Sequence, residues 1–150
     1  MKTILYRTPT IISIGGRDGS VRSADGLIDL QLAVPKEMGG QGGKTNPEEL
    51  FAAGYAACFH NAVKRVAADR KVPIGKSTVE AHVSIGPNDN GSGNMLGVEL
   101  HVTLLGADAE TAKDLVRGAH MICSYSNATR KNVDVKLSVT PIDGINYNVT

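Results

Sequence analysis

Aromatic residues are scarce in this chain: tryptophan is absent, and phenylalanine and tyrosine together make up 4% of its 150 residues. So few rings argue against a stacking platform of the kind that binds nucleotide bases. The net charge is only +1, and no cluster of lysine and arginine occurs along the sequence. Without such a cluster, nothing attracts a phosphate backbone. We therefore expect no nucleic-acid partner.

Long hydrophobic runs are also missing. No segment approaches the roughly 20 apolar residues of a membrane helix, and Tyr6-Arg7-Thr8-Pro9 interrupts the apolar N-terminus that a secretion signal would need. The sequence has no internal repeat, and its hydrophobic content of 41% and charged content of 21% are globular values. The sequence therefore predicts a single domain over residues 1–150, in the cytoplasm and without a membrane partner.

The strand signals begin at the N-terminus. Residues 3–14 and the segment "SVRSADGLIDLQLAV" predict three antiparallel strands, and Asp25-Gly26 is a strong signal for a two-residue hairpin turn. Further on, "KSTVEAHVSIG" and "NMLGVELHVTLLG" predict a second hairpin around the loop "PNDNGSGN". The segment "NVDVKLSVT" predicts a last strand.

Two helices are predicted between these strands. The first is capped by Asn46, with Pro47 in its first turn and Glu49 completing a capping box, and is expected to end at Asp69–Arg70. Asp108 is expected to cap the second, which has apolar residues at helical spacing. The order is therefore βββ-α-ββ-α-β. Strands in runs without strand–helix alternation predict an α+β protein with antiparallel sheets and two main helices.

Only two cysteines are present, one in each predicted helix. Cys58 lies in "FAAGYAACF", where small neighbours allow another backbone to come close, and Cys123 follows Ala119 by four positions on an apolar stripe. Free cysteine often merely packs in the core. In a cytoplasmic protein, however, a cysteine pair is more often reactive or metal-binding than a permanent cross-link. The residues leave open inert packing, metal ligation, and a redox pair close enough for a disulfide.

A metal site would need Cys58, His60, His120 and Cys123 to act together. Residues two apart on a helix point about 200° away from each other, so Cys58 and His60 cannot both face one ion. The His120 and Cys123 pair alone does not complete a zinc site. A cysteine hydrolase based on either histidine lacks a visible orienting partner. We expect neither a metal nor a bound cofactor.

A reactive thiol needs a positive neighbour or a helix N-terminus to stabilise its thiolate. Arg17, in the turn "GGRDG", is a candidate because loops on a rigid sheet often carry function; otherwise it is a solvated turn residue. Glu48 is a second candidate, or else an ordinary first-turn acid. In a straight helix Glu48 and Cys58 would be about 15 Å apart along the axis. A common site therefore requires a bend or restart near Gly54, and a restart would put Cys58 in a first helical turn.

Four segments together resemble one family: "GGRDG", "DGLIDLQLAVPKEMGGQGGKTNPE", "TNPEELFAAGYAACF" and "CSYSNATR". They resemble the organic hydroperoxide resistance (Ohr) branch of the Ohr/OsmC family of thiol peroxidases, over nearly the whole chain. The resemblance implies that Cys58 is the peroxidatic cysteine and Cys123 the resolving one. It also implies that Arg17 and Glu48 pair beside the reactive sulfur.

The same resemblance implies an assembly and an electron source. The family forms an intertwined homodimer with two active sites at the subunit interface. Its substrates are organic or fatty-acid hydroperoxides, and dihydrolipoyl groups on lipoylated enzyme subunits (dihydrolipoamide) supply the electrons. One departure is Ser124, where relatives commonly have proline, and we expect it to loosen the loop and slow disulfide closure. Lys131, often glycine in relatives, is a lesser change. The alternative function is a redox sensor or ligand-binding module that uses the cysteine pair without turnover.

Overall fold

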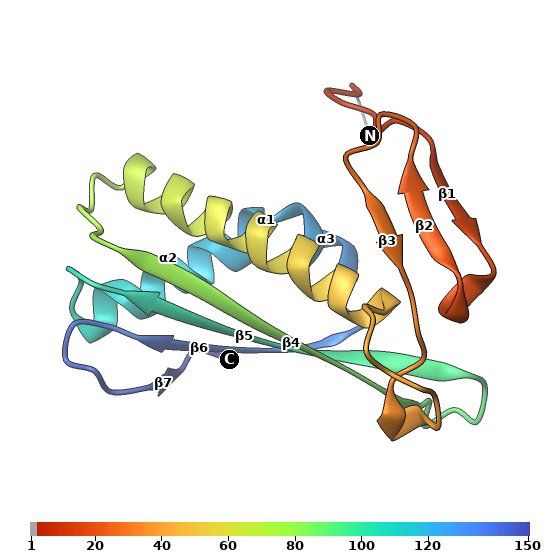
Figure 1. Cartoon of the computed structure of the whole chain (residues 1–150). Helices are drawn as coiled ribbons and strands as arrows, with labels where there is room; N and C mark the ends of the chain where they lie inside the picture. Colours follow the sequence, from red (N-terminus) through yellow and green to blue (C-terminus); the bar gives the residue numbers. More distant parts are fainter. Residues whose placement is uncertain (1–2) are drawn as a thin grey trace. The chain divides into compact units, whose positions relative to one another are not determined.

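The computed structural model describes residues 3–150. The chain forms two compact units, Met1–Leu50 and Phe51–Thr150, and each contains its own sheet (Figure 1). Among the described residues, no helix combines the length and the apolar character needed to cross a membrane.

The first unit contains an antiparallel sheet in the order β1-β2-β3. Its strands are β1 (Ile11–Ile14), β2 (Ser20–Ser23) and β3 (Asp29–Gln31), with short 3₁₀ helices η1 (Gly16–Asp18) and η2 (Lys36–Met38). The strand predicted over residues 3–14 is therefore reduced to its last four residues. The Thr10 carbonyl still accepts a hydrogen bond from the Ala24 N–H, but Pro9 has no N–H with which to continue a ladder.

The hairpin between β2 and β3 is wider than the two-residue turn predicted at Asp25-Gly26. The Ser23 N–H donates to the Ile28 carbonyl across 2.9 Å, which leaves four residues in the loop. The Ser23 hydroxyl accepts from the Ile28 N–H, also at 2.9 Å, and contacts the Asp25 carboxylate. Gly26 has a φ of 75°, as a left-handed turn position requires. Side-chain bonding by Ser23 thus stabilises the longer loop.

The second unit contains a four-stranded sheet in the order β4-β5-β6-β7. Its elements are α1 (Pro47–Asp69, which begins at the end of the first unit), β4 (Ser77–Pro87), β5 (Asn94–Leu104), α2 (Ala109–Ile122), α3 (Ser124–Thr129), β6 (Asp134–Thr140) and β7 (Tyr147–Asn148). The α+β class is confirmed. The short elements α3 and β7 were not predicted.

One strand pair departs from the predicted antiparallel arrangement, because β5 and β6 run parallel. Helices α2 and α3 connect these two strands and return the chain to the end of the sheet where β5 began. Such a crossover is how neighbouring parallel strands are joined. The expectation of wholly antiparallel sheets without strand–helix alternation was therefore wrong at this connection.

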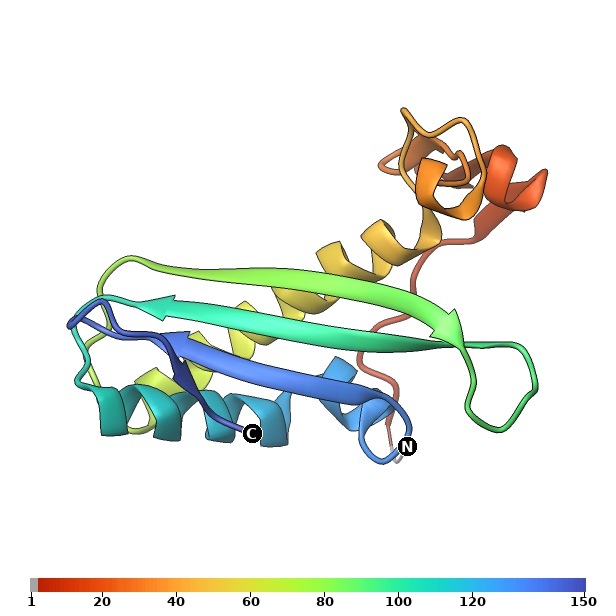
Figure 2. The ribbon, with the colours of Figure 1, turned by 90° about the horizontal axis from the view of Figure 1, so that it is seen from below.

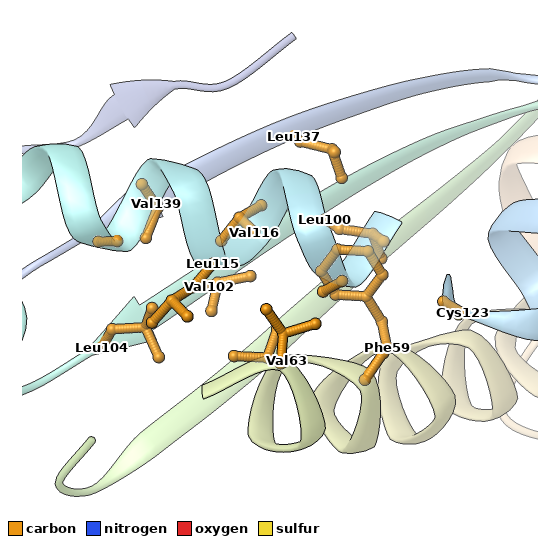
Figure 3. Packing of buried hydrophobic residues seen from close by; sticks show 14 of the residues in the cluster. Phe59, Val63, Leu100, Val102, Leu104, Leu115, Val116, Cys123, Leu137 and Val139 are labelled. Atoms are coloured by element: carbon orange, nitrogen blue, oxygen red, sulfur yellow. The ribbon is translucent and has the colours of Figure 1, made fainter. Parts of the chain in front are cut away.

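The core of the second unit lies between the sheet and its helices, which pack on one face (Figure 2). Every second residue of β5 points into this layer and is buried, from Val98 to Leu104, while residues between them, such as His101, lie on the other face. Phe59 and Val63 from α1 and Leu115 from α2 meet these strand residues (Figure 3). Cys123 belongs to the same cluster. The period-2 strand and the amphipathic helices therefore place one cysteine inside the core.

Candidate functional site

The two cysteines meet in the second unit. Cys58 is half-buried on α1, and Cys123 is 2% exposed at the junction where α2 ends and α3 begins. Both are free thiols, and the Cys123 Sγ donates toward the Cys58 Sγ over 3.3 Å. A disulfide has an S–S length near 2.05 Å, so a shift of about an ångström would join them. The arrangement is a dithiol close to disulfide geometry, in which Cys58 is half-buried and Cys123 is buried.

Helix α1 runs from Pro47 to Asp69, so the predicted restart near Gly54 is wrong. Cys58 lies in the helix interior and not in a first turn. The glycine has a different role. A Cβ added at Gly54 would lie 2.7 Å from the Tyr125 hydroxyl oxygen and 3.1–3.2 Å from two ring carbons. Gly54 therefore lets the Tyr125 ring pack against α1 one turn before Cys58.

This close contact gives a testable prediction for Gly54→Ala. The alanine favours helix by up to about 1 kcal/mol, but its methyl group must push the Tyr125 ring away. We expect little net change in the free energy of unfolding and a several-fold slower Cys58–Cys123 closure, because Tyr125 follows Cys123 by two residues. Stopped-flow oxidation and urea denaturation measure the two effects separately. Adding Tyr125→Ala should restore the closure rate; a double variant that stays slow would contradict this explanation.

Ser124 occupies the first position of α3, so it lies in a helix and not in a loop. The Cys123 carbonyl accepts a hydrogen bond from the Asn127 N–H at 2.9 Å, which closes the first turn. Proline is also well tolerated at a first helical position, so serine and proline can share this backbone. The expected slowing of disulfide closure by Ser124 stays a prediction.

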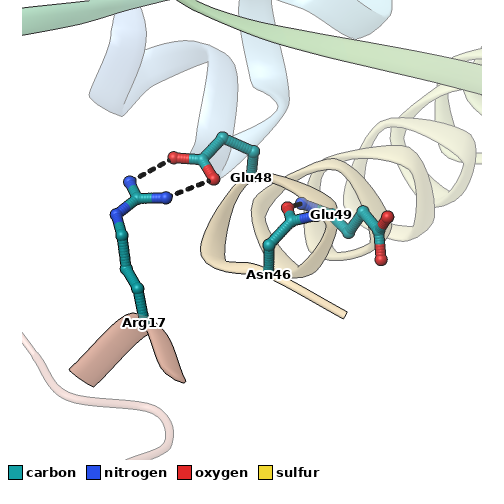
Figure 4. A network of polar contacts seen from close by, with 4 residues as sticks. All are labelled: Arg17, Asn46, Glu48 and Glu49. Atoms are coloured by element: carbon teal, nitrogen blue, oxygen red, sulfur yellow. Dashed lines mark hydrogen bonds and ion pairs between the residues drawn. The ribbon is translucent and has the colours of Figure 1, made fainter. Parts of the chain in front are cut away.

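Arg17 and Glu48 form a two-pronged ion pair within the first unit (Figure 4). Arg17 lies in η1 and Glu48 in the first turn of α1, and the two guanidinium nitrogens donate to the two carboxylate oxygens at 2.8 and 2.5 Å. The hydrogen bonds from Arg17 lower the pKa of Glu48 although burial acts in the opposite direction. The same bonds raise the pKa of Arg17. Both groups are therefore charged around neutral pH.

The start of α1 orients this carboxylate. The Asn46 side chain accepts a hydrogen bond from the Glu49 N–H at 2.9 Å, as predicted for a helix cap (Figure 4). The Glu49 carboxylate accepts from the Thr45 hydroxyl at 2.7 Å and so does not complete the expected capping box on Asn46. The cap fixes the first turn, and with it the position of Glu48.

A buried polar network that sequence reasoning missed surrounds the cysteines. The Tyr55 hydroxyl is hydrogen-bonded to the Ser126 hydroxyl at 2.9 Å and to the Thr129 hydroxyl at 3.2 Å. The Ser126 hydroxyl is also 3.0 Å from His120 Nδ1. Tyr55 precedes Cys58 by three residues and Ser126 follows Cys123 by three, which is the spacing of one helical turn. This spacing places each hydroxyl near a cysteine along the sequence, but it gives no sign that the two hydroxyls are hydrogen-bonded to each other.

The environment of Cys123 disfavours its thiolate at rest. Burial raises the pKa of the Cys123 thiol, and the neighbouring Cys58 sulfur raises it further. The polar groups of Ser126 act in the opposite direction without cancelling the effect of burial on this pKa. Cys123 is therefore a protonated thiol around neutral pH, and it can donate to a thiolate on Cys58.

An apolar cavity of about 210 Å³ opens beside α3, lined by Phe51, Tyr125, Ala128 and Thr129. The Tyr125 ring centroid lies 6.0 Å from that of Phe51 and 5.6 Å from that of Tyr55. Four of the six aromatic residues of the chain thus lie close together in the segments that contain the cysteines: Phe51, Tyr55, Phe59 and Tyr125.

Neither predicted histidine lies in a cluster of metal ligands. His60 Nε2 is hydrogen-bonded to Ser77, and His120 Nδ1 to Ser126. Across residues 3–150, no three His, Cys, Asp or Glu side chains converge in a way that could hold an ion.

The chain is similar to proteins of a known family. The family model for the OsmC-like protein matches residues 40–138, and this chain belongs to that family. An organic hydroperoxide resistance protein of Xanthomonas axonopodis pv. citri is 46% identical over 138 residues, which are 91% of this chain and 95% of the relative.

Solved structures of organic hydroperoxide resistance proteins are similar to this chain as well. The crystal structure of an organic hydroperoxide resistance protein from Legionella pneumophila is 48% identical, with a TM-score of 0.87 over 91% of this chain and 98% of that one. The organic hydroperoxide resistance protein OhrB of Bacillus subtilis is 41% identical, with a TM-score of 0.82 over 91% of this chain and 99% of that one. The resemblance to the Ohr branch is therefore confirmed.

Proposed function

We propose that this protein is a thiol peroxidase that reduces organic hydroperoxides to alcohols. The observation that carries the proposal is the 3.3 Å approach of a half-buried Cys58 to a buried Cys123, both as free thiols. A peroxide needs access to the first sulfur only, whereas the second sulfur must be within bonding reach. Relatives named organic hydroperoxide resistance proteins support a peroxide-detoxifying role.

The reaction has two chemical steps on the enzyme. The Cys58 thiolate attacks one peroxide oxygen, the O–O bond breaks, and the alkoxide leaves as an alcohol after taking up a proton. Cys58 is then a sulfenic acid. Cys123 attacks the Cys58 sulfur, water is lost and a disulfide forms. This closure protects Cys58 from further oxidation to irreversible acids.

Arg17 and Glu48 are proposed to complete the site. The Arg17 guanidinium would stabilise a Cys58 thiolate of the proposed dimer, in its own or the second copy, and orient the peroxide, while Glu48 would hold the guanidinium by its two hydrogen bonds. A fixed bidentate pair supports this role because it sets the direction of the cation before substrate arrives. The resemblance to the Ohr branch supports placing the pair beside Cys58.

The substrate is proposed to carry a hydrocarbon group. The cavity lined by Phe51, Tyr125, Ala128 and Thr129 is apolar and adjoins the segment that follows Cys123. An apolar wall favours an alkyl or aryl hydroperoxide over hydrogen peroxide, which has no apolar surface to bury. Fatty-acid hydroperoxides belong to this chemical class.

A homodimer is proposed as the working form, in the cytoplasm. Side chains of the first sheet leave much apolar surface exposed: 45% of Ile11, 52% of Ile12, 61% of Ile14 and 37% of Leu30. Ile12 and Ile14 share one face of this sheet and Ile11 and Leu30 the other, so each face carries exposed apolar residues that a partner would cover. An intertwined second copy would cover these residues and would bring active sites to the subunit boundary, as the family resemblance implies.

Dihydrolipoyl groups on lipoylated enzyme subunits are proposed as the reductant, on the strength of the same resemblance. Such a dithiol would attack the Cys58–Cys123 disulfide, form a mixed disulfide, and release both cysteines when its second thiol closes the lipoyl ring. The buried Cys123 makes the more exposed Cys58 the sulfur for this attack.

Steady-state consumption of cumene hydroperoxide tests the proposal, with dihydrolipoamide as the only electron source. We expect sustained turnover that is faster with cumene hydroperoxide than with hydrogen peroxide, and slower when glutathione replaces dihydrolipoamide. Consumption that stops after a single equivalent would instead indicate a redox sensor without turnover. Absence of any consumption would contradict the peroxidase assignment.

A further inference from the structure

Cys123 lies at a corner between α2 and α3, where its backbone is extended and not helical (φ −62°, ψ 128°). Two rotatable backbone dihedrals at this one residue decide how α3 leaves α2. The Cys123 side chain does not cap α3, and α3 has only six residues. Since the two sulfurs nevertheless lie 3.3 Å apart, contacts elsewhere must hold the corner in place.

We propose that Tyr55 is a positioning residue for disulfide closure, a role that rests on the proposed function. Its hydroxyl ties α3 to α1 through a chain of hydrogen bonds and so holds Cys123 against Cys58. The Tyr55 side chain is fully buried, and its hydroxyl lies 2.9 Å from the Ser126 hydroxyl and 3.2 Å from that of Thr129. Tyr55 precedes Cys58 by one turn of α1, so the tie is attached beside the sulfur that Cys123 must reach.

The direction of every bond in this chain follows from its last member, Thr129. The Thr129 hydroxyl donates its one proton to backbone carbonyls of α3, with that of Tyr125 at 2.9 Å, so toward Tyr55 it only accepts. Tyr55 therefore donates to Thr129, and the Ser126 hydroxyl donates to Tyr55. His120 Nδ1, 3.0 Å from the Ser126 hydroxyl, then carries a proton and donates to it. Each hydroxyl donates and accepts, so the buried network is fully satisfied.

The same network makes the corner a rigid unit. His120 precedes Cys123 by three residues and Ser126 follows it by three, so the hydrogen bond between their side chains spans the corner. The Arg130 guanidinium spans it a second time, because Nη2 donates to the His120 carbonyl and Nη1 to the Asn127 side chain, both at 2.7 Å. A contact that holds Ser126 in place therefore holds Cys123 as well.

Apolar packing alone would hold this corner less tightly. The Tyr125 ring packs over Gly54, but apolar contact has no preferred direction, so α3 could slide along α1 and keep much of it. A hydrogen bond weakens steeply when its length or angle departs from the favoured values. The Tyr55 hydroxyl therefore determines where along α1 the corner lies, and with it the distance between the two sulfurs.

Thiol exchange without peroxide tests this role. The aromatic disulfide dithiobis(nitrobenzoate) should release one coloured thiolate when it modifies Cys58 and a second when Cys123 displaces the remaining half. The rate of the second release measures closure alone, and Cys123→Ser, which should give only the first release, identifies the two phases. Because no peroxide takes part, a failure of the Tyr55 role is distinguished from a failure of the peroxidase assignment.

Tyr55→Phe should leave the first release unchanged and slow the second about tenfold, the upper range of what one buried hydrogen bond contributes. The equilibrium between the Cys58–Cys123 disulfide and dithiothreitol should shift toward the dithiol by a similar factor, because the looser corner brings the sulfurs together less often. Tyr147→Phe is the matched control, since it removes a tyrosine hydroxyl that donates to the exposed Asp143 carboxylate at 2.9 Å in the same unit. It should match the wild type in both measurements.

A loss of stability alone should not slow closure. Val139→Ala removes buried methyl groups from β6 and should lower the midpoint of urea unfolding while the second release keeps its wild-type rate. Equal slowing of closure by Val139→Ala and Tyr55→Phe would mean that general stability sets the rate, and would overturn the positioning role. Closure at the wild-type rate in Tyr55→Phe would overturn it as well.

Two substitutions of Thr129 keep the test readable if Tyr55→Phe fails to fold. Thr129→Val keeps the shape of the side chain but removes the hydroxyl that accepts from Tyr55, whereas Thr129→Ser keeps the hydroxyl and removes a methyl group. Closure should be several-fold slower in Thr129→Val and close to the wild-type rate in Thr129→Ser. The opposite order would show that packing, and not the hydrogen bond from Tyr55, positions the corner.

Discussion

Cys58→Ser is expected to abolish dihydrolipoamide-dependent consumption of cumene hydroperoxide, with a loss of at least about 1000-fold. Serine keeps the size of the side chain, but its hydroxyl does not form an anion near neutral pH, so no nucleophile remains for the peroxide. The fold should be retained, since Cys58 is only half-buried and serine is nearly isosteric with it. Peroxide consumption and circular dichroism measure the two properties.

Cys123→Ser is the informative control for this result. It keeps Cys58, so the first oxidation should proceed at close to the wild-type rate. Without the sulfur that lies 3.3 Å away, the sulfenic acid cannot close and should accumulate or oxidise further to a sulfinic acid. Equal first-oxidation rates in Cys58→Ser and Cys123→Ser would contradict the different roles given to the two sulfurs.

Arg17→Gln is expected to slow the reaction of Cys58 with peroxide about 100-fold, because one charge-stabilising donor is typically worth that factor. Glutamine keeps a polar side chain but removes the cation and its two hydrogen bonds to Glu48. Single-turnover oxidation followed by stopped flow isolates this step from disulfide closure. Arg22→Gln is the matched control, since Arg22 pairs with Asp29 on the exposed surface of the sheet in the same unit. Equal effects of the two variants would show that Arg17 acts only through overall charge.

The ionisation of Glu48 adds an expected pH dependence to this prediction. Since Arg17 lowers the pKa of Glu48 below its ordinary value of 4.5, the carboxylate stays ionised down to that region. The stabilising pair is therefore present at and above pH 5, and is lost as pH falls through the lowered pKa. Peroxide reactivity should show no loss from this pair between pH 7 and pH 5. Glu48→Gln should weaken the interaction that orients the Arg17 guanidinium throughout that pH range.

The starts of the two long helices could be predicted from local sequence. Asn46 and Asp108 cap their helices as expected, and Asp108 accepts from the Thr111 N–H at 2.8 Å. Caps are set by residues within one turn, so the sequence contains the necessary information. The segment "SYSNAT" has no apolar period, and α3 forms there because Cys123 ends α2 and starts the next turn. The parallel pairing of β5 and β6 likewise depends on where two helices return the chain.

The resemblance pointed to the residues of the candidate site and to its two pairs, but not to the polar network around the cysteines. The resemblance pointed to Cys58, Cys123, Arg17 and Glu48, and the structure brings them together as two pairs. Nothing local in the sequence joins Tyr55 to Ser126, because a hydrogen bond over 71 positions is decided by tertiary packing. The role of Gly54 was misjudged for the same reason. The absence of a side chain at Gly54 makes room for the Tyr125 ring from α3, and α1 continues through Gly54 without a break.

The most direct test of the central claim is the product of one oxidation cycle. Reduced protein is mixed with a single equivalent of cumene hydroperoxide, alkylated, and digested without reducing agent for peptide mass mapping. A cross-linked pair of peptides joined through Cys58 and Cys123, together with one equivalent of the alcohol, is the predicted result. Two alkylated cysteines with the peroxide unconsumed, or an oxidised Cys58 beside an alkylated Cys123, would contradict the account.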